Sequence, residues 1–500
     1  MDVLEPVGQY RRTPEPAVRR PAGTIPHALR SDAIGLRQSI VIGLGTSAPG
    51  QSAAVSMAAM VAAAAYATGP AILLSMLAML AMATCYQRLN LFDQNCGGPY
   101  VWVARAINPM VGYFVAWTML VGFVLGSVSD LLPLGPSLLG LLGLDVAGTV
   151  GNVVTATLFG LALTAVAALG IRTTARFQLL LAAFEYATLL TFCVIGFWAV
   201  FVTHRAGTVH PALSWLSFHG VGGRGSLSAA MLISIFLFAG WDAPMYLNEE
   251  TKAKSVTPGR SVLWSVAVLG VIYCVLFVTL QGAVSPAKLA AHQSDALPYI
   301  ASALVGHGWA RFMVVAVILS VLGTTQATLV ATSRVTYAMG TDRLLPQLFG
   351  SVSRRSSTPI GATIVWGVLT VLVVDLYVAW SSLANAFDTV VNALGIAFAV
   401  FWALTAVATV VYYRRVITRT PADFLLAAVL PLGAAGTLAW IVSEQLPQLP
   451  TGTRWTLLGL AVAGLVFMAF SAFVLKAPFF ALERSSFDPG APDRATGPGG

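Results

Sequence analysis

The sequence predicts an all-α polytopic membrane protein with about twelve transmembrane helices. Of its 500 residues, 57% are hydrophobic and only 10% are charged, whereas soluble domains carry roughly 25% charged residues. The mean hydropathy is +0.79, and apolar runs long enough to cross about 30 Å of hydrocarbon recur along the chain. The net charge of +8 is therefore attributed to membrane topology, and no nucleic-acid partner is expected.

The apolar runs are separated by polar connections, which set the expected helix boundaries. The helices are expected at 38–63, 68–89, 100–125, 147–171, 175–202, 226–247, 261–284, 309–339, 360–380, 384–413, 423–442 and 455–475. A long polar loop precedes the eighth helix and contains Asp295. The histidines of the expected outer loops should be solvated, and these are His204, His210, His219, His292 and His307.

The positions of Lys and Arg predict the orientation of these helices. If both termini lie in the cytoplasm, only five of the 28 Lys and Arg residues face outward, as the positive-inside rule requires. We therefore expect a multi-pass protein of the plasma (inner) membrane with both termini cytoplasmic. The five outward-facing residues are Arg205, Arg224, Lys288, Arg311 and Arg454.

The first expected helix contains a helix-breaking stretch in its middle. The run 43–50, Gly-Leu-Gly-Thr-Ser-Ala-Pro-Gly, has three glycines and a proline where a plain anchor would have leucine. Proline removes a backbone donor and glycine tolerates unusual conformations, so the freed backbone groups need partners in protein or in a polar cavity. The stretch predicts either a binding site at a helix break or a kink with close packing through small residues.

The sixth expected helix repeats this pattern and adds a carboxylate. The run 238–244, Phe-Ala-Gly-Trp-Asp-Ala-Pro, places Gly240, Asp242 and Pro244 within the span. Ionisable residues inside membranes usually face a cavity and serve function, although Asp242 can also be a structural charge capped by neighbouring backbone donors. Two interrupted helices at corresponding positions of two halves are typical of a secondary transporter.

These two breaks predict five helices followed by five more in inverted topology, with two extra helices. The polar N-terminal stretch lacks the short apolar core of a signal peptide, and both tails are expected to be cytoplasmic and mostly disordered. The expected divisions are an N-terminal tail at 1–35, a first five-helix repeat at 36–202, an extracellular loop at 203–225, a second repeat at 226–413, helices 11 and 12 at 414–475, and a C-terminal tail at 476–500.

Three sets of motifs lie between or at the ends of the expected helices. In this order and at these places they resemble the amino acid–polyamine–organocation (APC) superfamily of secondary transporters, over about 35–475. The motifs are Gly97-Gly98-Pro99-Tyr100-Val101-Trp102 with Arg105, Asn108-Pro109 and Gly112; Gly240-Trp241-Asp242 with Glu249-Glu250; and Ser333-Arg334 through Tyr337-Ala338-Met339 with Asp342 and Leu344-Leu345-Pro346.

The resemblance implies a LeuT-like fold with alternating access around a site at the membrane midplane. Exposed N–H groups around Thr46–Gly50 would hold a substrate carboxylate, because a half-helix N-terminus favours negative charge. Free carbonyls near Ile42–Gly43 and Phe236–Ala239 would accept ammonium protons, with Trp241 beside the pocket as a packing or gating aromatic. The break departs from the family's more glycine-rich pattern at Ala48-Pro49-Gly50. The implied substrate-binding residues are Ile42, Gly43, Thr46, Ser47, Ala48, Gly50, Phe236, Phe238, Ala239, Trp241, Asp242 and Asn392.

The fifth expected helix carries a second departure from the superfamily. Thr174-Ala175-Arg176 matches a small-residue stretch that precedes this helix, and nine residues later many proton-coupled members carry a lysine that faces the first helix. Here that position is Glu185. A carboxylate there can couple transport to a proton or cation, neutralise a cationic substrate, or bond the free amides of the first helix.

Other polar residues in apolar surroundings are weaker candidates. Thr324 and Thr325 on the eighth expected helix can line the cavity or a sodium-like ion site, or bond their own helix backbone. Asn392 on the tenth can face the pocket or join helices. No His, Cys, Asp or Glu cluster has the spacing of metal ligands, so neither a metal site nor a cofactor is expected.

The expected function is secondary active transport of amino acids or related amines, with proton-coupled symport as the leading hypothesis. An amino acid/amine exchanger, a non-transporting substrate sensor and a channel remain alternatives. The chain has no phosphate-binding Gly-Lys-Ser/Thr loop and no nucleophile–base arrangement, so an enzyme is not expected. The expected partners are a small-molecule substrate, a proton or sodium ion for coupling, and membrane lipid.

Overall fold

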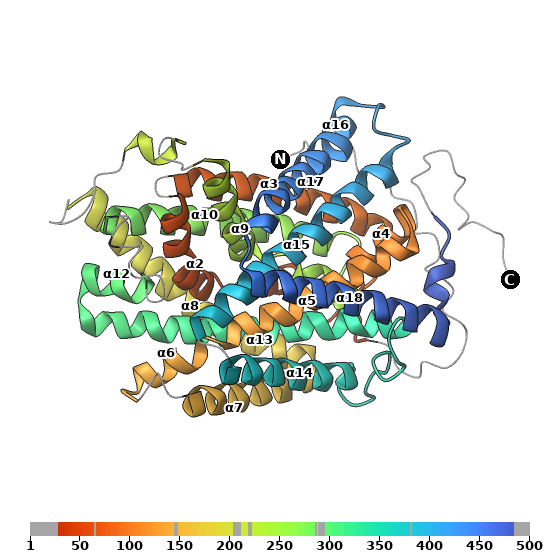
Figure 1. Ribbon diagram of the computed structural model, residues 1–500, viewed down its shortest axis with the longest axis horizontal. Coiled ribbons are helices and arrows are strands. Elements are labelled where there is room, and N and C mark those ends of the chain that lie inside the picture. The colour runs from red at the N-terminus through yellow and green to blue at the C-terminus, as the bar shows by residue number, and fades with distance from the viewer. Residues whose placement is uncertain are drawn as a thin grey trace.

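The computed structural model of the protein describes residues 29–64, 67–144, 149–203, 212–218, 223–285, 288, 296–380 and 383–484. Within these residues the chain is helical, and an isolated bridge between Ile34 and Thr251 is the only extended pairing, as Figure 1 shows. The structure confirms the predicted all-α class. Most of the expected tails lie outside the described residues, as do His204, His210, His219, His292 and Asp295.

Among the described residues, 11 helical segments are long and apolar enough to cross a membrane. Four of them combine two or more neighbouring elements. The segments are α3 (Thr68–Phe92), α5 (Pro109–Leu131) with α6 (Leu134–Leu141), α7 (Thr149–Ala168), α8 (Ile171–Phe201), α9 (Arg224–Phe238) with η4 (Ala243–Glu250), α10 (Thr257–Ala283), α13 (His307–Thr341), α14 (Ile360–Trp380), α15 (Leu383–Tyr413), the stretch of α16 (Pro421–Phe424), η5 (Leu425–Val429) and α17 (Leu430–Gln445), and α18 (Thr451–Ala469) with η7 (Phe470–Val474).

The first expected span is a pair of half-helices, α1 (Leu36–Thr46) and α2 (Pro49–Ala64), so the predicted break is confirmed. α1 has 11 residues and α2 has 16, and neither alone reaches the roughly 20 residues that span a bilayer. Ala48 lies between them in left-handed backbone at φ 42. Pro49 then begins α2, because its fixed φ suits a helix start and its missing N–H costs nothing there.

The sixth expected span is also broken where predicted. α9 ends at Phe238, and Ala239 turns to an extended ψ of 138. Gly240 follows at φ +94, a conformation that side-chain-bearing residues rarely adopt. The chain resumes as η4, a 3₁₀ helix with Pro244 in its first turn. Both halves of the molecule therefore carry one interrupted helix at the same place in their order.

The predicted bounds of the third helix, 100–125, are wrong at both ends. The chain instead forms α4 (Pro99–Ala106), turns, and starts α5 at Pro109. The Asn108 side chain accepts a hydrogen bond from the Met110 N–H at 2.7 Å, and Pro109 follows at the first helical position. The Asn-Pro pair therefore stops one helix and caps the next, and α5 then runs on to Leu131.

The connection before the eighth span is shorter than expected. A helix, α12 (Ala296–Val305), occupies part of it. α13 begins at His307, which sequence analysis had placed in the loop. Residues 296–305 of this connection are therefore helical rather than an open polar loop.

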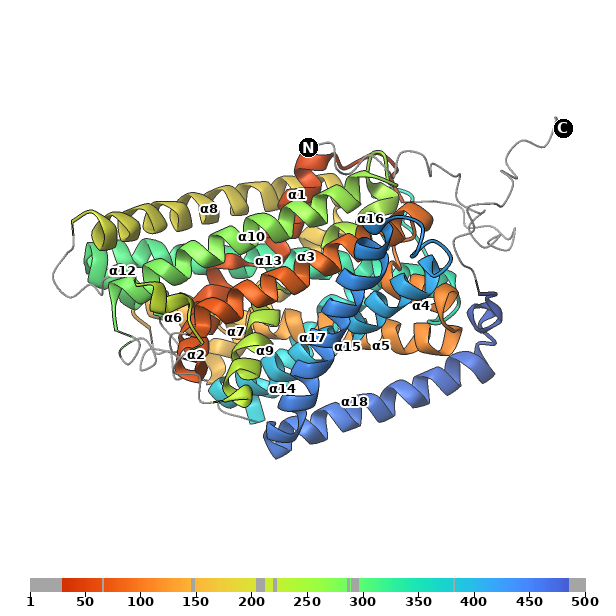
Figure 2. The ribbon, with the colours of Figure 1, turned by 90° about the horizontal axis from the view of Figure 1, so that it is seen from above.

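The two halves pack helix against equivalent helix. α2 contacts α9, α3 contacts α10, α5 contacts α13 and α7 contacts α14, which pairs each of the first four spans with its counterpart in the second half. Figure 2 shows α8, α10 and α3 running alongside one another, with α18 at the edge of the bundle. α1 lies between α8, α10 and α13, so the breaks meet at the centre.

Candidate substrate site at the broken helices

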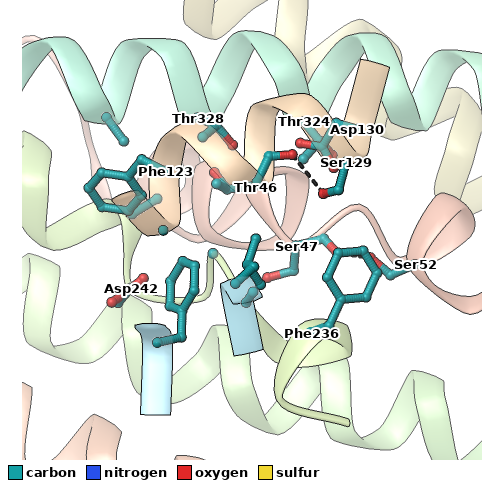
Figure 3. A pocket seen from close by; sticks show the side chains of 18 of the residues that line it. Thr46, Ser47, Ser52, Phe123, Ser129, Asp130, Phe236, Asp242, Thr324 and Thr328 are labelled. Carbon is teal, nitrogen blue, oxygen red and sulfur yellow. Dashed lines mark hydrogen bonds between the residues drawn. The ribbon is translucent and has the colours of Figure 1, made fainter. Parts of the chain in front are cut away.

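A small cavity lies where the two breaks meet. It has about 40 Å³ of room for the centres of water-sized molecules, enough for about three waters. Its walls come from the two broken spans and from α5, α13 and α15, as Figure 3 shows in part. The lining residues are Thr46, Ser47, Ser52, Gly122, Phe123, Gly126, Ser129, Asp130, Phe236, Ala239, Gly240, Asp242, Ala243, Tyr246, Thr324, Thr328, Ala331, Leu394 and Phe398.

The amides just before α2 are used inside the break itself. The N–H of Ser47 donates to the carbonyl of Leu44 at 3.2 Å, and that of Ala48 donates to the carbonyl of Gly45 at 3.4 Å. Pro49 has no N–H. The expected carboxylate site depended on these positions, and in this structure none of the three offers a free donor.

The amides that begin α2 are bound by side chains of neighbouring helices. The N–H of Gly50 donates to Oε1 of Glu185 on α8 at 2.9 Å, and that of Gln51 donates to Oγ of Ser320 on α13 at 3.2 Å. The Ser320 hydroxyl in turn donates to Glu185 Oε1 at 2.6 Å. Glu185 is 3% exposed. Because it accepts a hydrogen bond from the Gly50 N–H, its carboxylate lies where the N-terminus of α2 would bind an anion.

The glycine before Gln51 leaves room for this arrangement. A Cβ on Gly50 would lie 3.2 Å from Glu185 Oε1 and 3.4 Å from Ser320 Oγ. A Cβ there would require the carboxylate of Glu185 to shift by a few tenths of an ångström. The small residue that sequence analysis read as part of a helix break therefore also admits the acidic side chain of α8.

The carbonyls at the end of α1 are covered by the chain's own hydroxyls. Thr46 Oγ1 donates to the carbonyl of Ile42 at 2.6 Å, and Ser47 Oγ donates to the carbonyl of Gly43 at 3.1 Å. Ser and Thr commonly bond the carbonyl one turn earlier in a helix. The expected ammonium acceptors at Ile42 and Gly43 thus already have donors.

Asp242, the carboxylate of the second break, is held by three donors through a single oxygen. Its Oδ2 accepts from Tyr246 Oη at 2.6 Å, from Tyr86 Oη at 3.1 Å and from Trp402 Nε1 at 3.1 Å. Its Oδ1 is buried and has no hydrogen-bond partner among the described residues. The carboxylate is fixed in orientation, and one oxygen remains available to a ligand.

The predicted site residues divide into two groups. Those that line the cavity are Thr46, Ser47, Phe236, Ala239, Asp242 and Thr324. Thr324 reaches the first break, because its Oγ1 donates to the carbonyl of Gly45 at 2.9 Å. Those outside the cavity wall are Ile42, Gly43, Ala48, Gly50, Glu185, Phe238, Trp241, Thr325 and Asn392.

Trp241 lies behind the site instead of beside the cavity. Its ring centroid is 5.0 Å from that of Tyr86 and 5.8 Å from that of Trp402, and the side chain is fully buried. Tyr86 and Trp402 are two of the three donors to Asp242. Trp241 therefore packs the residues that orient this carboxylate.

Asp130 on α5 is a cavity residue that was not among the predicted site residues. It lies beyond the expected end of the third helix at 125, where the apolar run was taken to stop. The structure extends α5 to Leu131, buries Asp130 to 5% exposure and places it on the cavity wall. An isolated acidic residue in an apolar surrounding was the signal that could have identified it.

One end of the bundle is closed by a buried ion pair and a backbone clasp. Arg334 Nε lies 2.9 Å from Glu250 Oε2, and both side chains have 0% exposure. The N–H groups of Ala33 and Ile34 donate to the carbonyl of Glu250 at 2.8 and 3.1 Å, and Lys252 N–H donates to the carbonyl of Ile34 at 2.8 Å. The segment before α1 is thereby joined to the end of η4.

A cavity between two discontinuous helices, at the centre of two inverted five-helix repeats, defines a LeuT-like transporter fold. The sequence profile described as amino acid permease matches residues 33–488. The chain therefore belongs to the amino acid permease family, within the APC superfamily of membrane transporters.

Individual relatives agree with this assignment. The chain is 25% identical over 325 residues to the methylthioribose transporter of Bacillus subtilis, covering 61% of this chain and 67% of that protein. It is 25% identical over 326 residues to the vacuolar cationic amino acid transporter 4 of Arabidopsis thaliana, covering 60% and 52%. These relatives are transporters of small molecules, and the protein is a transporter rather than an enzyme.

The fold is also that of a solved transporter. A crystal structure of the Eremococcus coleocola manganese transporter, in complex with an aromatic bis-isothiourea substituted compound, matches with a TM-score of 0.55. The match covers 90% of this chain and 98% of that one at 13% sequence identity. At this identity the likeness concerns the fold alone.

Proposed function

We propose that this protein is a secondary active transporter that carries an amino acid or related amine across the plasma membrane by alternating access, as a proton symporter. The observation that carries the proposal is the cavity at the junction of the two broken helices, with two acidic side chains on its wall. Membership of the amino acid permease family supports the substrate class.

The cavity must widen for a substrate to enter. Its room of about 40 Å³ is far below the roughly 300–1,000 Å³ of ligand pockets, so the arrangement corresponds to a closed state. Opening towards one side requires α1 and η4 to move away from α13, which separates the Arg334–Glu250 pair. The backbone clasp from Ile34 to Lys252 makes α1 and η4 move together.

Glu185 is the proposed coupling residue. Its carboxylate joins the start of α2 to α8 and α13 through Gly50 N–H and Ser320 Oγ. Protonation neutralises the carboxylate and removes most of its attraction for the positive end of α2. Uptake of a proton therefore frees the break to rearrange, which links proton binding to movement of the broken helix.

The proposed orientation places both termini in the cytoplasm. In that orientation the clasp and the Arg334–Glu250 pair lie on the cytoplasmic side of the cavity, since α1 precedes the break and η4 follows it. The closed end described above is then the inner gate. The Lys and Arg distribution supports this orientation.

The test is uptake by the purified protein in sealed proteoliposomes. We expect labelled amino acid or amine to accumulate when the outside is acidic relative to the lumen, and counterflow to occur without a gradient. Counterflow without gradient-driven accumulation would indicate the exchanger. Binding without counterflow would indicate the sensor, and conductance without saturation would indicate a channel; each of the three contradicts the proposal.

A further inference from the structure

We infer that Asp130 makes the cavity selective for an organic cation with two separated positive groups, an aliphatic diamine, over a zwitterionic amino acid. Asp130 receives one ammonium group and Asp242 receives the other. The inference deepens the proposed function and rests on it for the place where the substrate binds.

Asp130 is a buried carboxylate on the wall of the cavity. Its side chain is 5% exposed and lies on the cavity wall. Among the residues that the structure describes, no hydrogen-bond donor and no basic side chain pairs with it. An uncompensated carboxylate in such a position carries a large desolvation cost, and a cationic ligand offsets part of that cost by supplying the opposite charge.

Asp242 offers a second acceptor at the other end. The three donors on Oδ2 hold the carboxylate in place, and Oδ1 remains buried without a partner among the described residues. Figure 3 shows the side chains of Asp242 and Asp130 at opposite ends of the cavity, with Thr46 and Ser47 between them. The two acidic groups are therefore placed to bind two different positive groups.

The apolar part of the cavity wall suits an aliphatic linker. Phe123, Phe236, Leu394 and Phe398 contribute apolar and aromatic surface, which buries methylene groups favourably and whose rings also attract cations. No Lys, Arg or His is among the lining residues. The cavity thus combines two negative ends with an uncharged middle.

The amides of the first break offer no free donors to a substrate carboxylate. Ser47 and Ala48 N–H groups are bonded within the break, and those of Gly50 and Gln51 are bonded to Glu185 and Ser320. Glu185 already fills the anion position at the start of α2. A carboxylate brought to the first break would meet Glu185 and no unoccupied amide between Ser47 and Gln51, so a zwitterion is disfavoured there relative to a diamine.

The positive ligand is organic rather than metallic. No group of three His, Cys, Asp or Glu side chains that could hold a metal ion occurs among the described residues. Hard divalent cations require several oxygen ligands at close range, and the two carboxylates lie at different ends of the cavity. Ammonium groups need only one or two acceptors each, which this arrangement provides.

The experiment measures the affinity of the purified full-length protein for four probes by thermal stabilisation and calorimetry. The probes are putrescine, butylamine, ornithine and leucine, which differ in the second ammonium and in the carboxylate. We expect putrescine to bind most tightly and leucine most weakly. In Asp130→Asn the dissociation constant for putrescine should rise about tenfold to a hundredfold, while that for butylamine changes little, because its single ammonium binds Asp242.

The matched control is Asp375→Asn, which removes the same charge from a membrane span away from the cavity. Asp375 on α14 accepts from Thr157 Oγ1 at 2.9 Å and is not a lining residue. The Asp375→Asn variant should bind putrescine with the same affinity as the wild type. If Asp130→Asn does not fold, Asp130→Ser tests the same loss of charge with a smaller side chain.

The deciding result is that the Asp130 variants lose the preference for putrescine over butylamine. If Asp130 had only a structural role, the variants would bind both probes more weakly and to the same extent. The inference is overturned if leucine binds as tightly as putrescine, if no diamine binds, or if the neutral variants keep the wild-type ratio. Failure of the proposed function would give a different result. Putrescine would then bind in a way that depends on Asp130, but it would not be transported in proteoliposomes. That result contradicts the proposed transport and supports the inference about the ligand.

Discussion

Gly240 in the second break lies directly against the carbonyl of Thr46 in the first. A Cβ built on Gly240 would be 2.5 Å from the Thr46 oxygen and 2.7 Å from its carbonyl carbon. The two broken helices therefore touch backbone to backbone, and Gly240 permits this contact both by its missing side chain and by its φ of +94. This contact places the two breaks around one cavity.

Gly240→Ala should damage both stability and transport. The left-handed conformation alone costs a non-glycine residue roughly 1–2 kcal/mol, and the clash with the Thr46 backbone adds to it. We expect a lower melting temperature in detergent and loss of substrate binding. Gly436→Ala is the control, since nothing lies within 4 Å of a Cβ there; equal effects of the two variants would show that the contact between the breaks is unimportant.

Glu185→Gln should separate binding from coupling. Glutamine keeps an oxygen acceptor for Gly50 N–H and Ser320 Oγ but carries no titratable charge. We expect substrate counterflow to continue in proteoliposomes, while accumulation driven by a pH gradient is lost. The control is Glu444→Gln on α17, which contacts neither break. Gradient-driven uptake that persists in Glu185→Gln would remove Glu185 from the coupling mechanism.

Tyr246→Phe should remove one of the three hydrogen bonds that hold the Asp242 carboxylate in place. The Tyr246 hydroxyl makes the shortest of the three hydrogen bonds to Oδ2, at 2.6 Å, and a hydrogen bond to a charged group contributes about 1.5–3 kcal/mol. We expect a lower melting temperature and weaker ligand binding. Tyr186→Phe provides the comparison, because the Tyr186 hydroxyl is buried with no partner among the described residues, so its removal should not destabilise the protein.

Arg334→Gln should destabilise the closed end of the bundle. It leaves Glu250 buried without its counter-ion, a change that costs about 3–5 kcal/mol for a buried pair. Arg334→Lys should not restore stability, because the guanidinium donates from Nε at 2.9 Å and from a second nitrogen at 3.3 Å, and a lysine cannot reproduce both. Thermal unfolding measures the effect, with exposed Arg419→Gln as the control; full rescue by lysine would contradict this role.

The breaks and the span boundaries were largely predictable from sequence, because each has a local cause. Apolar length determines the spans, and the missing N–H of Pro49 and the backbone freedom of Gly240 stop the helices where they were expected to stop. The third span was misjudged because Asn108-Pro109 was read as part of a family motif rather than as a helix cap. Its far end was misjudged because Asp130 interrupts an apolar run that continues to Leu131.

The hydrogen-bond partners within the site were decided only by the tertiary structure. From the residues alone, the amides of the first break were open to a carboxylate, and Glu185 had three possible roles. The fold brings α8 and α13 against the start of α2, and the amides are then occupied by Glu185 and Ser320. Hydrogen-bond partners far apart in the chain cannot be read from local pattern.

The sequence by itself determined that this chain is a membrane-embedded helical transporter of the APC superfamily with two interrupted helices, since hydropathy, helix-breaking residues and short motifs are local properties. Only the tertiary structure decided which polar groups remain without partners. Burial makes an unmatched polar group costly. Among the residues that the structure describes, the cavity wall presents Asp130 and the unpaired Oδ1 of Asp242 as acidic groups to which a ligand can bind.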